Sequence, residues 1–66
     1  MSVKYPEVTV ELSGTDGNAF SILARVSGAL KRAGVDSKER DAFYAEATAG
    51  DYDALLRTAM KWVNVD

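Results

Sequence analysis

The sequence predicts a small α+β domain in which one N-terminal strand is followed by three helices, with residues 63–65 as a candidate for a short C-terminal strand. Apolar residues alternate with polar ones near the N-terminus, and from residue 19 onward they recur at helical spacing. Gly34 and Gly50 divide the helical region into three parts. With 66 residues the chain has room for a single core. We therefore expect residues 1–66 to form a single compact domain.

The strand is predicted over residues 7–12. Its alternating apolar residues are Val8, Val10 and Leu12. Pro6 has no backbone N–H to donate, so it belongs at the start of the strand or at a sheet edge. The turn-rich stretch 13–18 ends the strand. Because a lone strand leaves its backbone groups unpaired, it needs a partner, either residues 62–65 or a strand of a second copy.

The first helix is predicted over about residues 19–33, with Asn18 or Asp16 as its N-cap. Its apolar residues fall within one arc of the helix: Ala19, Ile22, Leu23, Val26, Ala29, Leu30 and Ala33. Lys31 and Arg32 lie in its last turn, and Gly34 is suited to the left-handed conformation that ends a helix. Val35 is then placed to contact the last turn, as in a Schellman motif.

Two further helices are predicted from their caps. Asp36 and Glu39 have capping-box spacing, which places a helix from 37 to about 49, and Asp51 can cap another from 52 to about 62. The second helix has a narrow apolar face: Phe43, Tyr44 and Ala47. The third has a wider one: Tyr52, Leu55, Leu56, Ala59, Met60 and Val63, with Trp62 flanking. We expect a common core of six residues: Leu23, Val26, Leu30, Leu55, Leu56 and Ala59.

The composition excludes several classes of function. The chain has no cysteine and no histidine, so thiol catalysis, zinc sites built from these ligands, iron–sulfur clusters and histidine triads are excluded. The net charge of −2 lacks the basic excess of most nucleic-acid-binding domains. The apolar runs are too short for a transmembrane helix or a signal peptide. We expect a cytoplasmic protein with no metal and no cofactor.

The polar motifs are better interpreted as structural features than as sites. The 13–18 turn lacks the Gly-Lys-Ser/Thr ending of a phosphate-binding loop, and its Asp16 would repel phosphate. The third helix begins with Asp51 and Asp53, which argues against a recognition helix in a DNA groove. Paired carboxylates are explained as caps, as the solvent face of the strand, or, for Asp53, as a partner of Arg57. We expect no enzymatic activity, because so small a core leaves little room for a water-excluding pocket.

Three segments carry a resemblance to small proteins of phages and mobile elements: residues 14–20 (GTDGNAF), 50–57 (GDYDALLR) and 61–63 (KWV). With the 25–34 segment between them, the resemblance covers roughly residues 8–65. That group has no defining activity, so it implies a setting rather than a chemistry. By analogy of size and setting, the resemblance implies an inhibitor of a host defence system, as anti-CRISPR proteins are.

The leading hypothesis is a binding module that blocks nucleic-acid engagement by a larger host protein or ribonucleoprotein complex. Tyr44, Tyr52 and Trp62 are of the types enriched in binding hot spots. The predicted contact is an acidic side that meets a basic surface, with Tyr44 as the aromatic anchor. Its acidic residues are Glu7, Glu11, Asp41 and Glu46.

Two alternatives remain open at the level of sequence. One is a nucleic-acid-associated regulator with a basic face made of Arg25, Arg32, Arg57 and Lys61. The other is a structural accessory protein that assembles through its strand edge. A monomer is favoured, and a strand-mediated dimer is the alternative.

Overall fold

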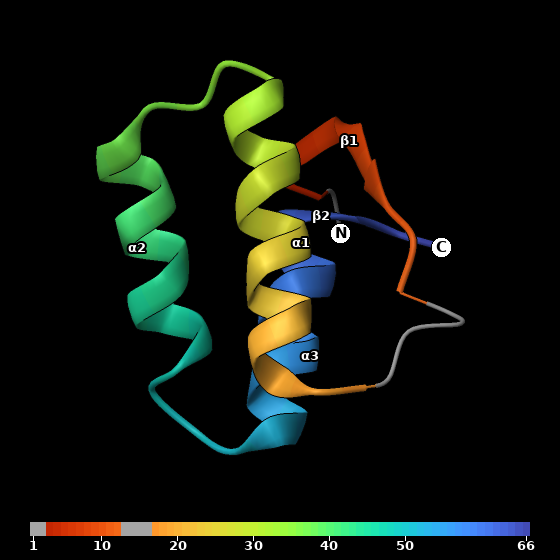
Figure 1. Ribbon diagram of the computed structural model, residues 1–66, viewed down its shortest axis with the longest axis vertical. Coiled ribbons are helices and arrows are strands. Elements are labelled where there is room, and N and C mark those ends of the chain that lie inside the picture. The colour runs from red at the N-terminus through yellow and green to blue at the C-terminus, as the bar shows by residue number, and fades with distance from the viewer. Residues whose placement is uncertain (1–2, 13–16) are drawn as a thin grey trace.

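The computed structural model describes residues 3–12 and 17–66 (Figure 1). Its elements follow one another as β1 (Tyr5–Val10), α1 (Ala19–Arg32), α2 (Ser37–Ala47), α3 (Tyr52–Trp62) and β2 (Val63–Val65). This order confirms the predicted α+β class, including the C-terminal strand. Most of the predicted 13–18 turn, with Asp16, lies outside the described residues. No helix in the described ranges is long and apolar enough to cross a membrane.

The two strands form a parallel sheet of two, so β1 finds its partner within the chain. Tyr5 pairs with Val63, and the register then shifts before pairing resumes further along β1. β1 begins two residues earlier than predicted, because the Lys4 amide already donates to the Lys61 carbonyl at 2.9 Å. Pro6 lies at the interruption in the register, where its missing N–H costs no ladder hydrogen bond.

Each helix begins at a side-chain cap, as predicted. Asn18 Oδ1 accepts a hydrogen bond from the Phe20 amide at 2.8 Å. Asp36 and Asp51 each accept from the amide three residues later, at 2.9 and 3.0 Å. These bonds satisfy backbone donors that a helix cannot satisfy itself. The caps therefore set where all three helices start.

The end of α1 confirms the predicted Schellman motif. Gly34 has φ +89°, its amide donates to the Lys31 carbonyl, and the Val35 amide donates to the Leu30 carbonyl, both at 3.0 Å. α2 ends at Ala47, two residues before the predicted end. Thr48 is the C-cap of α2, and its hydroxyl donates a hydrogen bond to the Tyr44 carbonyl in the last turn of the helix at 2.8 Å.

The core lies where α1, α2, α3 and the sheet meet. α2 packs against both α1 and α3, and α1 packs against β1 (Figure 1). The buried apolar residues are Val8, Val10, Ile22, Leu23, Val26, Ala29, Leu30, Phe43, Ala47, Leu55, Ala59, Trp62 and Val63. Five of the six predicted core residues are buried, and Leu56 is half-buried.

The side of α3 that is buried differs from the apolar face predicted from the sequence. Met60 is 52% exposed, whereas Trp62, placed at the margin by the sequence, is buried at 4%. The buried stripe is made of Leu55, Thr58, Ala59 and Trp62. α3 is rotated in this way because it packs on α2 along one side and continues directly into β2.

Candidate functional site

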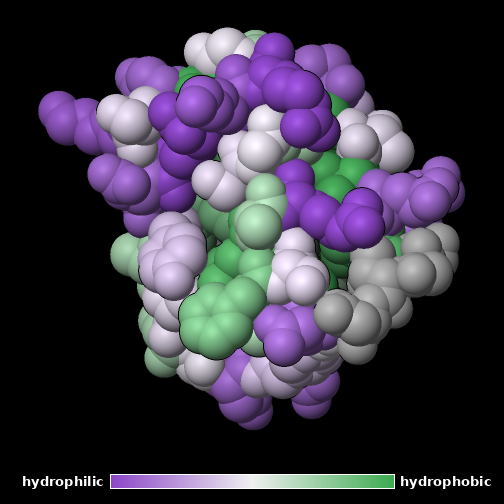
Figure 2. Space-filling view, viewed as in Figure 1, coloured by the Kyte–Doolittle hydropathy of each residue, from purple (hydrophilic) through white to green (hydrophobic). Residues whose placement is uncertain are grey.

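A hollow of about 270 Å³ opens where the first turn of α1, the last turn of α2 and the first turn of α3 meet. Its lining residues are Ala19, Phe20, Leu23, Tyr44, Ala47, Thr48, Gly50, Asp51, Tyr52 and Leu55. Figure 2 shows apolar surface gathered on this face of the molecule. Pockets for small-molecule ligands usually measure about 300–1,000 Å³, whereas a cavity of about 150 Å³ holds benzene. The hollow therefore has the size for one or two apolar side chains.

Three aromatic side chains at this hollow are exposed to solvent. Phe20 is 75% exposed, Tyr44 47% and Tyr52 43%. Leaving aromatic surface in water forgoes the free energy of burial, about 25 cal/mol for each Å². Aromatic side chains are enriched in protein–protein interfaces, where their rigid rings bury a large area at a small cost in entropy. These three residues therefore form an aromatic rim suited to contact with another protein.

Local structure explains how the rim is assembled. Phe20 is the second residue of α1, and Tyr52 is the first residue of α3. The Tyr52 hydroxyl donates a hydrogen bond to the Gly17 carbonyl, which holds α3 to the segment before α1. A Cβ at Gly50 would lie 2.8 Å from the Cβ of Ala54, so only glycine fits without a shift in the turn that brings α2 to α3. The rim thus depends on the connection between these two helices.

One carboxylate, that of Asp51, lines the hollow, and no lysine or arginine is among its lining residues. Asp53 follows Asp51 in the first turn of α3 but does not line the hollow, because it lies about 160° around the helix from the lining residue Leu55. Asp41 lies one helical turn before Tyr44, on the same side of α2. All three are exposed, and none takes part in an ion pair within the described ranges. The lining of the hollow is therefore mostly apolar, with Asp51 as its one charged residue.

The structure divides the predicted acidic side. Tyr44 lines the hollow, and Asp41 lies one turn before it on the same side of α2, but Glu46 lies about 160° around α2 from Tyr44. Glu7 and Glu11 are exposed on another element, the first within β1 and the second just after it. Of the predicted acidic residues, Asp41 is thus the one that accompanies the predicted anchor.

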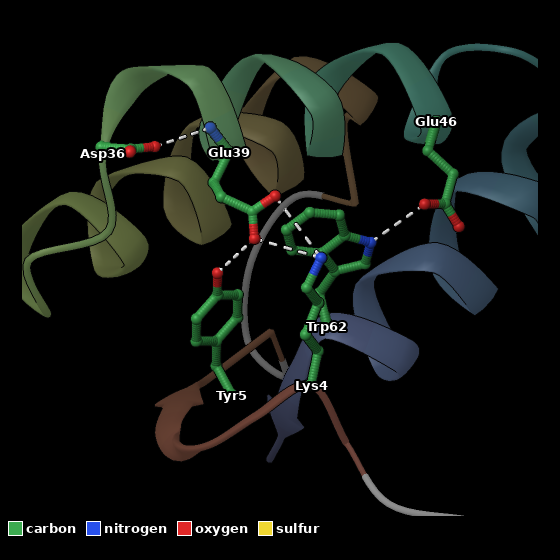
Figure 3. Close-up of polar contacts among 6 residues, drawn as sticks. All are labelled: Lys4, Tyr5, Asp36, Glu39, Glu46 and Trp62. Carbon is green, nitrogen blue, oxygen red and sulfur yellow. Dashed lines mark hydrogen bonds and ion pairs between the residues drawn. The ribbon is translucent and has the colours of Figure 1, made fainter.

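Glu46 instead joins α2 to α3. Its Oε2 atom forms an ion pair with Lys61 Nζ at 3.0 Å, and its Oε1 atom accepts a hydrogen bond from Trp62 Nε1 at 3.1 Å (Figure 3). Lys61 and the Trp62 N–H hold the pKa of Glu46 below its ordinary value. Lys61 is one of the four residues of the predicted basic face, and its charge is thus already paired with Glu46.

The remaining members of that basic face lie on two helices. Arg25 and Arg32 lie exposed on α1, two turns apart, and Arg57 lies exposed on α3. None of them makes an ion pair within residues 3–12 and 17–66, so the predicted pair of Asp53 with Arg57 does not form there. No group of carboxylates in the same ranges could hold a metal ion.

A second polar cluster joins β1, α2 and α3 around Glu39 (Figure 3). The Glu39 carboxylate accepts a hydrogen bond from the Tyr5 hydroxyl at 2.6 Å and forms an ion pair with Lys4 at 3.1 Å. Lys4 Nζ also lies 4.1 Å from the centre of the Trp62 ring, a cation–π contact. Asp36 caps α2 as predicted, but the Glu39 side chain turns to β1, so half of the expected capping box forms.

The Glu39 cluster predicts a pH dependence of stability. The hydrogen bond to Glu39 and the nearby negative charge raise the pKa of Tyr5 from 10.0 to about 12, and the Tyr5 and Lys4 contacts lower the pKa of Glu39 from 4.5. A raised tyrosine pKa stabilises the fold below pH 10, and this contribution is lost as the pH rises toward 12. A lowered carboxylate pKa stabilises it above pH 4.5, and this contribution is lost as the pH falls.

We therefore expect a melting temperature that is level between these limits and falls on both sides. Tyr5→Phe should weaken the alkaline fall, and Glu39→Gln the acid one, when melting is followed by circular dichroism across pH. Tyr44→Phe is the matched control, because Tyr44 lies outside the cluster. An alkaline fall of the same size in Tyr5→Phe as in the parent would contradict the role of Tyr5.

Comparisons of this chain with protein-family models, with curated proteins and with solved structures find no match. The resemblance to phage and mobile-element proteins therefore stays a prediction from the sequence. What the chain can bind has to be inferred from its own surface.

Proposed function

We propose that this protein is a binding module that holds an apolar side chain of a larger protein in the hollow between α1, α2 and α3. The observation that carries this proposal is the exposure of Phe20, Tyr44 and Tyr52 around one apolar depression. A partner that covers them buries three aromatic rings at once, which is how binding energy concentrates at a few residues of an interface.

The chemistry of the hollow favours binding over a reaction. Most of its lining is hydrocarbon or aromatic, and its one carboxylate, Asp51, is the N-cap of α3. A group that must keep capping its helix is poorly placed to exchange protons with a substrate. The hydroxyls of Tyr52 and Thr48 are likewise engaged with backbone carbonyls.

We further propose a cytoplasmic inhibitor that acts as a monomer on a nucleic-acid-binding complex of a host cell. Support for this finer statement comes from the sequence resemblance and from the net charge of −2, which would suit a basic surface. Its test is a gel-shift assay of target DNA binding by a CRISPR ribonucleoprotein. The protein should prevent binding, and a Phe20→Ser/Tyr44→Ser double variant should not. Equal DNA binding with and without the protein would overturn inhibition of that complex.

The binding function is tested by selection from a displayed library of random peptides on the immobilised protein. We expect peptides to be enriched that bind the parent at least about tenfold more tightly than the Phe20→Ser/Tyr44→Ser variant, because that variant removes two of the three aromatic contacts. Arg25→Ser is the matched control: it changes an exposed residue of α1 that does not line the hollow.

Folding of each variant is checked first by circular dichroism. Enrichment of no peptide, or of peptides that bind the double variant as tightly as the parent, would contradict the proposal.

A further inference from the structure

We infer that a second copy of this chain occupies the hollow when no partner is bound, with Phe20 of each copy inserted into the hollow of the other. This inference rests on the proposed function and deepens it, since it assigns a regulation to the same site. The protein is then a weak dimer in the absence of its partner, and it binds that partner as a monomer.

Phe20 leaves the hollow beside it open. It belongs to the lining, yet it is 75% exposed, so most of its surface faces solvent. A dry cavity of about 150 Å³ holds benzene, and the hollow measures about 270 Å³, so the phenyl ring of another chain has room inside it. Leu23, Ala47 and Leu55 line the hollow and are buried, and they offer such a ring hydrocarbon to pack on.

The ring and the hollow lie on one surface, which is what a two-fold interface requires. In such an interface residue i of one copy contacts residue j of the other while j contacts i, so one patch has to contain both members of the contact. Phe20 and the hollow meet this condition, because Phe20 is part of the lining. A single two-fold rotation then fills both hollows and covers both rings, and the assembly closes at two copies.

The charges of the lining allow two like surfaces to meet. No lysine or arginine lines the hollow, and its one carboxylate, Asp51, gives an oxygen to the Ala54 amide at the start of α3. A surface with so few charges gives no preference to a charged segment of another protein. It is complementary to a copy of itself, because apolar surface meets apolar surface on both sides.

The exposed aromatic area determines how strong this dimer is. An aromatic side chain buries about 150–250 Å², so at the exposures of Phe20, Tyr44 and Tyr52 the six rings of two copies offer roughly 650 Å². Stable interfaces bury about 1,200–2,000 Å² in total. The rings supply about half of the smallest stable interface, so we expect a dissociation constant of about 0.1–1 mM. A dimer this weak gives way to a larger partner.

Sedimentation equilibrium from about 10 μM to 1 mM measures this association. The average mass of the parent should rise from that of one chain toward that of two. Phe20→Ser should raise the dissociation constant at least about tenfold, because it removes both inserted rings. Arg25→Ser is the matched control: it changes an exposed residue of α1 outside the lining and should associate like the parent. Circular dichroism confirms that each variant folds.

Two complementary variants distinguish insertion of the ring from nonspecific association. Phe20→Ser keeps the hollow and lacks the ring. Ala19→Glu keeps the ring and places a carboxylate in the lining, which an inserted ring would have to desolvate. Glutamate suits this position, because Ala19 is the first residue of α1 and that first turn has no acidic residue. An equal mixture of the two should associate more strongly than either variant alone, since the ring of one enters the hollow of the other.

Contacts between the copies are measured directly in a mixture of isotope-labelled and unlabelled parent at about 1 mM. Isotope-filtered nuclear Overhauser effects should join the Phe20 ring of one copy to the Ala47 and Leu55 methyl groups of the other. Contacts along β1 instead would show pairing through the strand edge and would overturn the inference.

The outcomes separate this inference from the proposed function. A chain that stays monomeric at the highest concentration while selected peptides bind at the hollow would overturn the dimer and leave the binding module standing. A dimer through the hollow with no peptide enriched would support the second copy as occupant and contradict the binding of another protein. Selected peptides that convert the dimer to monomers would support both.

Discussion

Phe43→Ala should leave the chain largely unfolded at physiological temperature, whereas Phe20→Ala should unfold much like the parent. The Phe43 side chain is completely buried on α2, and its ring meets the Trp62 ring edge-on with centres 5.5 Å apart. Truncation of a buried phenylalanine costs about 3–5 kcal/mol, because the lost burial adds to the cost of the cavity left behind. For a domain of this length the whole free energy of unfolding is only about 3–10 kcal/mol.

Phe20→Ala is the control for Phe43→Ala, because it makes the same substitution at a ring that is 75% exposed. Surface substitutions usually change the free energy of unfolding by less than about 0.5 kcal/mol. Urea unfolding of both variants, followed by circular dichroism, measures the difference. A Phe43→Ala protein whose midpoint lies near that of the parent would show that α2 is not held by this core contact.

Trp62→Ala should have an effect of similar size, because this side chain joins three parts of the fold. Trp62 is 4% exposed, and its ring centre lies 5.9 Å from that of Tyr5 and 5.5 Å from that of Phe43. Lys4 lies over the ring, and the Trp62 N–H donates to Glu46. We expect a loss of about 3–5 kcal/mol in the free energy of unfolding.

Trp62→Phe separates the packing of this ring from its hydrogen bond. It keeps an aromatic ring in the core but removes the N–H donor, and Glu46 retains its ion pair with Lys61. A net hydrogen bond contributes about 0.5–1.5 kcal/mol, and the smaller ring adds a packing loss, so this variant should fall clearly between the parent and Trp62→Ala in urea unfolding. Equal losses in the two variants would mean that the contact with Glu46, rather than the packing, dominates.

The aromatic rim depends on residues that the sequence singled out only in part. Tyr44 and Tyr52 are of types enriched in hot spots, so they could be selected from the sequence. Phe20 lies at the margin of the apolar arc of α1, and nothing in its neighbours shows that it stays 75% exposed. Its exposure follows from the position of α2 and α3, which leave the first turn of α1 uncovered.

The Glu39 cluster could not be predicted for a related reason. Tyr5 and Lys4 are 34 and 35 residues away from Glu39 in the chain, and no motif links them. The capping-box spacing of Asp36 and Glu39 correctly indicated a helix start. It also assigned the Glu39 side chain to its own backbone, because a local pattern contains no information about a strand that packs nearby.

The sequence alone determined the features whose causes lie within a few residues. The caps Asn18, Asp36 and Asp51 bond to amides two or three residues away, and the left-handed Gly34 bonds within its own turn. The tertiary structure alone decided which part of each helix is covered. Helical periodicity defines an apolar stripe, but the rotation of that stripe depends on what packs against it. For this reason Trp62 is buried while Met60 is exposed, and the start of α1 meets the distant connection between α2 and α3 around one hollow.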